Sequence, residues 1–183
     1  MKHHYDIEKI NRHNFRNSLE AMAQPGKRQQ ITPLFGSSLL AMASVFLYVE
    51  VSHYQESALD FGLIGAICGS PLASQKEADY LFLDSPLARM VSSAKIGTSE
   101  NPEESATLIF SYTSDQLRNG TAAVLEGPGI DGRKAVELPV DSLFVEELTW
   151  KNSDFPLGVD LFFIGWDDSL IGLPRTTRIE VAR

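Results

Sequence analysis

Cysteine is almost absent from this sequence, whose 183 residues include only Cys68. A single thiol cannot form a disulfide within the chain, and sites that need several cysteines for zinc or an iron–sulfur cluster are excluded with it. The surrounding letters GAICGS are small or apolar. This context predicts that Cys68 is buried and unreactive rather than a nucleophile.

Long apolar runs and basic runs are also missing. The most apolar stretch, residues 39–51, contains Glu50 and is shorter than the roughly 20 residues that cross a bilayer. The opening letters MKHHYDIEK lack the apolar core of a signal peptide. The formal net charge of -8 repels the phosphates of a nucleic acid on average. We therefore expect a cytoplasmic protein that binds neither a membrane nor a nucleic acid.

The motifs of common catalytic and metal-binding sites are absent too. No H-E-x-x-H, Walker A or G-x-S-x-G sequence occurs. His3 and His4 are adjacent near the N-terminus, His13 lies on a predicted helix, and His53 stands alone, so no set of metal ligands is evident. The lysines lie in or beside polar contexts, and none stands out as the low-pKa amine that a Schiff base requires. We predict no catalytic residue, no metal and no cofactor.

Apolar residues, by contrast, make up 43% of the sequence, enough for the core of a domain of this length. On the first predicted helix, Phe15, Leu19 and Met22 share one face, which we expect to be buried. Asp84 or Ser85 is placed to cap a later helix. Periodicity and stop signals predict helices over residues 11–24, 37–46, 56–67, 85–94 and 141–151.

Compact apolar stretches predict strands over residues 78–84 and 106–112, with a short strand near residues 27–32. Residues 46–52 fit the end of a helix or a strand equally well. Several of these strands are apolar on both faces, and such strands need a covering layer on each side. We therefore predict one domain over residues 1–183, with a three-layer α/β/α fold and a mixed sheet.

The glycines of LEGPGIDG, residues 125–132, have the G-x-G-x-x-G spacing of a dinucleotide-binding loop. That loop requires a helix directly after the glycines, with free backbone amides aimed at a pyrophosphate. Here the following letters, RKAVEL, favour a strand, and Pro128 lacks one of the amides. We therefore predict a β-hairpin over residues 121–138 with a glycine-rich loop, and no dinucleotide site.

Two opposite charges interrupt the apolar C-terminal segment, Asp160 and Arg175. A two-residue turn at residues 167–168 places Leu161 opposite Pro174, and Asp160 opposite Arg175. Facing residues on paired strands have Cβ atoms about 4.5–5.5 Å apart, which brings an ion pair within reach. Two consecutive aspartates are not ideal for so tight a turn, and a longer loop shifts the register by one. The pattern predicts a structural ion pair where Pro174 interrupts the strand pairing.

The same end of the chain has a second interpretation. Arg175, Thr176, Thr177 and Arg178 place guanidinium and hydroxyl donors close together, as phosphate recognition favours. The letters RTTRIEV also alternate like a plain edge strand, so both interpretations stay open. If an anion binds here, Arg175 and Thr176 are the residues that we predict to contact it.

Four stretches of the sequence resemble the PhnH family of the carbon–phosphorus lyase machinery. HNFRNSLEAMAQPG (13–26) is similar to the family's start and FPLGVDLFFIGWDDSLIGLPRTTRIEV (155–181) to its end. GTSENPEESATLIF (97–110) and LEGPGIDG (125–132) lie between them in the family's order, whereas residues 45–75 depart from its pattern. The residues that match the family motifs are His13, Phe15, Arg16, Pro25, Gly26, Gly127, Gly129, Asp160, Pro174, Arg175, Thr176 and Thr177.

The resemblance implies an α/β fold similar to the large domain of pyridoxal-phosphate-dependent transferases, without the cofactor lysine and therefore without pyridoxal phosphate. It also implies a cytoplasmic subunit of the carbon–phosphorus lyase core complex, with PhnG, PhnI and PhnJ homologues as partners and a homodimer when isolated. That complex transfers a phosphonate such as methylphosphonate to the ribose of ATP with loss of adenine. Two alternatives stay open: a stand-alone enzyme of the pyridoxal-phosphate type, and a protein that binds a phosphonate or a nucleotide.

Overall fold

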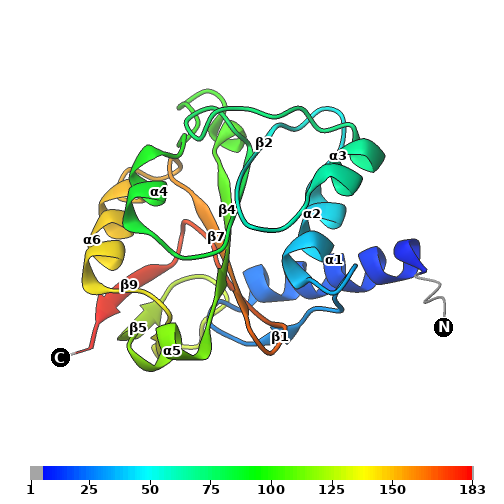
Figure 1. The fold of residues 1–183 in the computed structure, drawn as a ribbon. Helices are drawn as coiled ribbons and strands as arrows, with labels where there is room; N and C mark the ends of the chain where they lie inside the picture. The colour runs from blue at the N-terminus through cyan, green and yellow to red at the C-terminus, as the bar shows by residue number, and fades with distance from the viewer. Residues whose placement is uncertain (1–5, 183) are drawn as a thin grey trace.

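The computed structural model describes residues 6–182, which form two β-sheets and six α-helices (Figure 1). The main sheet has the strand order β1-β8-β7-β4-β3-β2, and the small sheet has the order β6-β5-β9. The strands are β1 (Gln29–Gln30), β2 (His53–Glu56), β3 (Tyr80–Leu83), β4 (Thr107–Tyr112), β5 (Thr121–Glu126), β6 (Lys134–Leu138), β7 (Asp160–Gly165), β8 (Ser169–Leu173) and β9 (Arg178–Val181). The helices are α1 (Ile7–Ala23), α2 (Ser38–Phe46), α3 (Gly62–Cys68), α4 (Ala88–Ser93), α5 (Ser114–Arg118) and α6 (Ser142–Lys151), with a short 3-10 helix η1 (Pro102–Glu104).

The main sheet is mixed, because β2, β3, β4 and β7 run parallel whereas β8 is antiparallel to β7 and β1 is antiparallel to β8. In β3, Leu81 and Leu83 face one side and Phe82 faces the other, and the same alternation of apolar residues recurs in β4 and β7. Helices α4 and α6 cover the first side, and α1, α2 and α3 cover the second (Figure 1). The predicted mixed sheet between two helical layers is confirmed.

Most predicted elements form close to their expected positions. The Ser37 hydroxyl accepts a hydrogen bond from the amide of Leu40 at the start of α2, over a distance of 3.3 Å. Asp141 caps α6 by accepting from the amide of Phe144, at 2.8 Å. The glycine-rich segment forms the antiparallel β5–β6 hairpin, with a strand after its loop. The predicted β-hairpin is confirmed.

Three local predictions were wrong. Helix α4 begins after Leu87 without a side-chain cap, because the carboxylate of Asp84 accepts instead from the Ser57 hydroxyl and the Ala58 amide. Residues 46–52 form neither a longer helix nor a strand, and the strand begins only at His53. The helix expected over residues 56–67 is the shorter α3, consistent with the low helix propensity of its glycines.

Helix α1 buries a different face from the one that its apolar residues predict. Phe15 and Leu19 are 47% and 55% exposed, whereas Asn14 and Ser18 are buried. The side-chain amide of Asn14 donates to the carbonyl of Thr32 and accepts from the amide of Thr32, each at 2.9 Å, and Ser18 donates to the carbonyl of Asn14. Polar groups with satisfied hydrogen bonds are stable in the interior. Two residues of the predicted face, Phe15 and Leu19, are consequently left at the surface, whereas Met22 is partly buried against the core.

The loop between β7 and β8 contains three residues, Trp166 to Asp168, rather than the two that we expected. Asp168 has φ 61, and its amide donates to the carbonyl of Gly165 at 3.0 Å. Two-residue turns of the common hairpin type need positive φ at both central positions, whereas a three-residue loop needs it at one. Leu161 therefore pairs with Leu173, and the predicted register was wrong by one residue.

Cys68 lies at the end of α3, where it is partly exposed and packs at the edge of the core that contains α2. The expected full burial was wrong, because α3 contributes only Ile64 as a fully buried residue. Partial burial still raises the pKa of the Cys68 thiol, so at neutral pH it is mostly protonated and a poor nucleophile. Within residues 6–182, no helix combines the length and the apolar character that crossing a membrane requires.

Candidate functional site

Residues of the family-like motifs come from distant parts of the chain and meet where the small sheet packs against α1 and β8. Gly129 lies so close to the end of α1 that an added Cβ would overlap the carbonyl oxygen of Ala23. Gly127 approaches the backbone of Thr176, where an added Cβ would lie 2.9 Å from the carbonyl oxygen. Gly26, with φ 72, leaves room for Leu125 of β5. These glycines allow backbone segments to pack closely, and they hold the C-terminal segment beside the glycine-rich loop.

Asp160 and Arg175 form the predicted ion pair, despite the shifted register. A carboxylate oxygen of Asp160 lies 2.5 Å from Nη2 of Arg175, and the other accepts from the Arg175 amide at 2.8 Å and from Nε at 3.3 Å. The guanidinium also donates to the carbonyls of Pro102 at 2.9 Å and Pro156 at 3.3 Å, and to the hydroxyl of Ser105. We call these five residues the ion-pair cluster.

Arg175 has no donor left for a ligand. An arginine side chain carries five N–H groups, and each nitrogen of this one donates within the ion-pair cluster. The side chains of Arg175 and Asp160 are only 16% and 22% exposed. This geometry favours the structural interpretation of Arg175 over the interpretation as an anion ligand.

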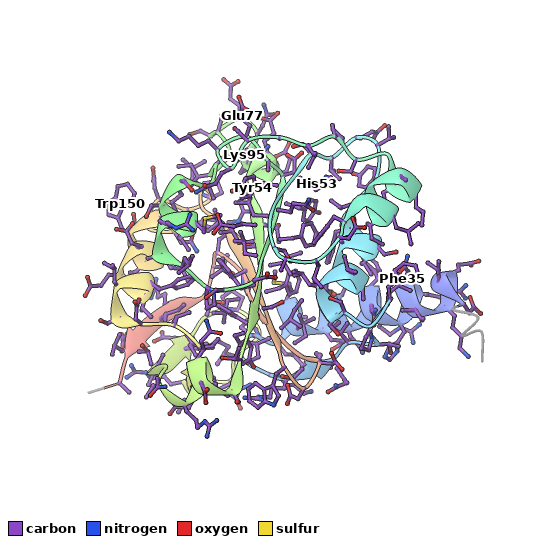
Figure 2. All side chains as sticks on the ribbon, in the orientation of Figure 1. Phe35, His53, Tyr54, Glu77, Lys95 and Trp150 are labelled. Atoms are coloured by element: carbon purple, nitrogen blue, oxygen red, sulfur yellow. The ribbon has the colours of Figure 1, made fainter. Side chains whose placement is uncertain are left out.

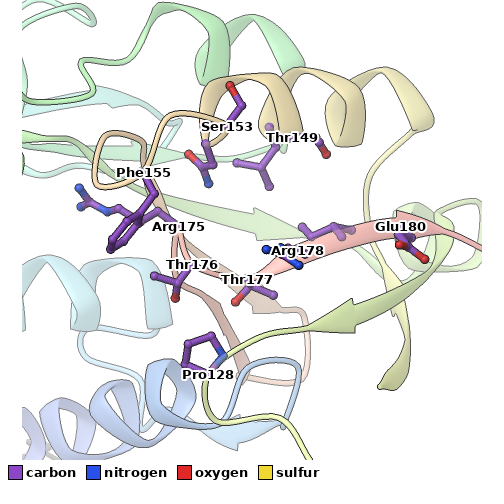
Figure 3. Close-up of a pocket in the computed structure, with 12 residues that line it drawn as sticks. Pro128, Thr149, Ser153, Phe155, Arg175, Thr176, Thr177, Arg178 and Glu180 are labelled. Atoms are coloured by element: carbon purple, nitrogen blue, oxygen red, sulfur yellow. The ribbon is translucent and has the colours of Figure 1, made fainter. Parts of the chain in front are cut away.

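A cavity of about 710 Å³ lies beside the ion-pair cluster, between the C-terminal end of α6, the loop after it and the segment that leads into β9 (Figure 3). We call it the β9 cavity. Its apolar walls come from Pro128, Leu148, Phe155 and Ile179. Its polar lining includes Thr176, Thr177, Arg178 and Glu180, which all belong to the C-terminal segment.

Two arginines line the β9 cavity, Arg175 and Arg178, and Arg178 is the one whose guanidinium is not engaged in the ion-pair cluster. It is exposed, and its side chain makes no hydrogen bond or ion pair with any residue between 6 and 182. Figure 3 draws both arginines among the lining residues, with the Arg175 side chain beside Phe155 and the Arg178 side chain farther along β9. Sequence reasoning named Arg175 and Thr176 as the anion contacts, from the cluster of guanidinium and hydroxyl donors over residues 175–178. The contacts that distinguish the two arginines come from residues about 70 positions away.

Thr177 lines the same cavity and is buried, being 7% exposed. Its hydroxyl oxygen has no hydrogen-bond partner among the described residues. The neighbouring Thr176 is partly exposed and also lines the cavity. Glu180, at the far end, forms an ion pair with Arg133. The cavity therefore combines an unpaired cation, two hydroxyl groups and apolar walls.

The histidines are not brought together. His13 is exposed on α1, 3.1 Å from the side-chain amide of Asn17. His53 is buried at the start of β2, where its Nδ1 lies 2.8 Å from the Ser70 hydroxyl, and burial lowers its pKa (Figure 2). His3 and His4 lie outside the described residues. Across residues 6–182, no three His, Cys, Asp or Glu side chains gather as a metal site.

Two lysines have a property that their sequence contexts did not indicate. Burial lowers the pKa of Lys134 and of Lys151. The ammonium group of Lys151 donates to the carbonyl of Ser92 at 2.8 Å, whereas Lys134 lies on β6 beside the loop of the hairpin. Neither lysine lines the β9 cavity.

Comparison with known proteins gives two matches. A family model described as "Bacterial phosphonate metabolism protein (PhnH)" matches residues 5–180. The "Putative C-P lyase subunit protein HtxG" of Stutzerimonas stutzeri is 29% identical over 110 residues, which are 60% of this chain and 54% of that protein. The aligned region thus spans about half the length of this curated relative.

Proposed function

This chain belongs to the PhnH family of bacterial phosphonate metabolism proteins, and we propose that it is an accessory subunit of a carbon–phosphorus lyase assembly. In this proposal it works in the cytoplasm with PhnG, PhnI and PhnJ homologues. It supports their transfer of a phosphonate to the ribose of ATP, with loss of adenine, and does not catalyse that reaction alone. The family match over residues 5–180 and the similarity to HtxG support a role of this kind.

The observation that carries the proposal is the inverted orientation of α1. This helix buries polar residues, with satisfied hydrogen bonds, and exposes the apolar side chains of Phe15 and Leu19. Phe15 belongs to the N-terminal family motif together with His13 and Arg16, and all three side chains are exposed. Exposed apolar side chains that gather on one face commonly mark a protein–protein contact. We infer that the exposed residues of the N-terminal motif contact a partner protein and do not pack in the core of this chain.

A second apolar face lies on α3. Leu63 and Ile67, one helical turn apart, are each more than half exposed. Val49 is also exposed and lies within 3.8 Å of the position of a Cβ at Gly69, next to the end of α3. This face belongs to residues 45–75, which we expect to resemble the family only loosely. Partner contacts made here are expected to be specific to this chain and its closest relatives.

Copurification tests the proposal. The tagged full-length chain is coexpressed with PhnG, PhnI and PhnJ homologues from the same genome, and the retained subunits are quantified. We expect retention by the unmodified chain, and at least about a tenfold loss when Phe15→Asp and Leu19→Asp are combined. Trp150→Asp is the matched control, because Trp150 is equally apolar and exposed but projects from α6 on the opposite layer (Figure 2). Absence of any retained subunit with the unmodified chain would refute the proposal.

The proposal extends to the fold likeness with the large domain of pyridoxal-phosphate-dependent transferases and to a homodimer of the isolated chain. Pyridoxal phosphate itself is not expected to bind. The test is the imine absorbance after the cofactor is added to the isolated protein. An absorbance that disappears on Lys134→Met or Lys151→Met would favour a stand-alone enzyme instead, because a lowered pKa makes an amine more nucleophilic.

A further inference from the structure

We propose that the β9 cavity is a binding site for a small organic molecule that carries a phosphonate or phosphate head and an apolar body, with Arg178 as its anchoring cation. This goes beyond the accessory role, because a subunit that only docks needs no small-molecule site of its own. The inference rests on the contents of the cavity and on the contrast with Arg175.

The dimensions of the cavity suit such a ligand. Its volume of about 710 Å³ lies within the roughly 300–1,000 Å³ that small-molecule sites occupy. Leu148 and Ile179 form apolar walls, and the Phe155 ring stands at the edge in Figure 3. Phe155 is exposed, so its ring is available to cover an apolar or aromatic ligand body. Aromatic rings contribute large contact areas in such sites.

Arg178 supplies the charge for the head group. Two carboxylates belong to neighbouring positions of the small sheet: Glu126, the cross-strand partner of Arg178 on β5, and Glu180, two residues along β9. Neither forms an ion pair with Arg178, and Glu180 pairs with Arg133 instead. The guanidinium therefore keeps its parallel N–H groups for two oxygens of a phosphonate or phosphate, the geometry for which arginine is suited.

The two threonines supply donors for the remaining oxygen. The hydroxyl of Thr177 is buried in the cavity lining without a partner, and buried polar atoms in folded proteins nearly always have one. Thr176, the preceding residue, also lines the cavity. A carboxylate head has two oxygens, both of which the guanidinium can satisfy, whereas a phosphonate or phosphate has a third oxygen for a hydroxyl donor. The donor set therefore favours the phosphorus-containing head.

Calorimetry on the isolated full-length chain tests the site, with phenylphosphonate, phenyl phosphate, methylphosphonate and inorganic phosphate as probes. We expect both phenyl compounds to bind more tightly than the two probes without an apolar body. Whichever phenyl compound binds more tightly identifies the source of the head group, a phosphonate or a phosphate ester. Undetectable heat with both phenyl compounds at millimolar concentration would overturn the proposal.

Two substitutions separate the head from the body of the ligand. Arg178→Gln is expected to weaken phenylphosphonate binding at least about tenfold, because it removes a charge-assisted pair. Arg118→Gln is the control, since Arg118 is an exposed arginine that pairs with Asp115 on α5, away from the cavity. Phe155→Ser is expected to reduce the preference for phenylphosphonate over methylphosphonate while methylphosphonate binding persists. Unchanged affinity in Arg178→Gln would overturn the assignment.

The binding experiments test the cavity independently of the copurification that tests the accessory role. Arg178 lies on β9 and Phe15 on α1, so Arg178→Gln should leave the copurification with partner subunits unchanged. If the assembly forms but no probe binds, the site proposal fails alone. If probes bind through Arg178 but no subunit is retained, the accessory role fails alone.

Discussion

The ion-pair cluster and the β9 cavity lie side by side and contain arginines only three residues apart, yet the two side chains have opposite surroundings. Every nitrogen of the Arg175 guanidinium donates to a protein acceptor. Arg178 has no such partner among the described residues and stands in a cavity with apolar walls. Two arginines in one short segment can therefore have different roles, one structural and one available for binding. The local sequence does not show which arginine has which role.

The largest effect is expected from breaking the ion-pair cluster. Asp160→Ala leaves a mostly buried guanidinium without its countercharge, and such changes lower the free energy of unfolding by about 3 kcal/mol or more. Urea unfolding at neutral pH measures the loss. Asp115→Ala is the matched control, because it breaks an exposed pair with Arg118 that is worth at most about 1 kcal/mol. Equal losses in the two variants would contradict the structural role of Asp160.

A smaller effect of opposite sign is expected in the cavity. Thr177→Val replaces a buried, unpaired hydroxyl with a methyl group of similar size, which removes the desolvation cost and raises the free energy of unfolding by about 1 kcal/mol. The same substitution should weaken phenylphosphonate binding. Higher stability together with weaker binding is expected when a residue contributes to ligand binding but destabilises the folded protein. Reduced stability in urea unfolding would instead show that the hydroxyl has a partner in the folded protein.

The smallest effect is expected from a change of pH, which acts through His53 and away from both arginines. Burial lowers the pKa of His53, so the folded protein holds a neutral imidazole while the unfolded chain takes up a proton near pH 6.5. Stability from this group is therefore complete above that pH and is lost as the pH falls through the folded pKa. The free energy of unfolding should be lower at pH 5 than at pH 7.5.

Two variants assign that pH dependence. His53→Gln should reduce the difference in unfolding free energy between the two pH values, because the titrating imidazole is gone. His13→Gln, at an exposed position of α1, is the control substitution. If the two variants keep the same pH dependence, another group causes it.

Several features of the fold and site were readable from local sequence. Apolar strands such as residues 106–112 indicated a sheet covered on both faces, and the letters after Gly132 excluded a dinucleotide loop. The ion pair between Asp160 and Arg175 was predicted correctly, because two opposite charges within an apolar hairpin have few other partners. The register was missed by one, since three-residue and two-residue loops differ only in backbone geometry at residues 166–168.

Other features depended on contacts that no local pattern encodes. The apolar residues of α1 indicated a buried Phe15, but the helix is held by hydrogen bonds between Asn14 and Thr32, on the opposite face. The α4 cap was missed because Asp84 is bound by residues 57 and 58, which the parallel pairing of β2 and β3 brings alongside. In each case the hydrogen-bond partner of a polar side chain is distant in the sequence and is brought close only by the fold.

The sequence by itself determined the family, the alternation of apolar residues that requires two covering layers, and the existence of the Asp160–Arg175 pair. These follow from residue identity and from short spacings, which the chain carries in any conformation. Only the tertiary structure decided which arginine is enclosed and which is available, because Pro102 and Ser105 reach Arg175 from about 70 residues away. Hydrogen bonds depend on distances of a few ångströms, and those distances exist only once the chain has folded.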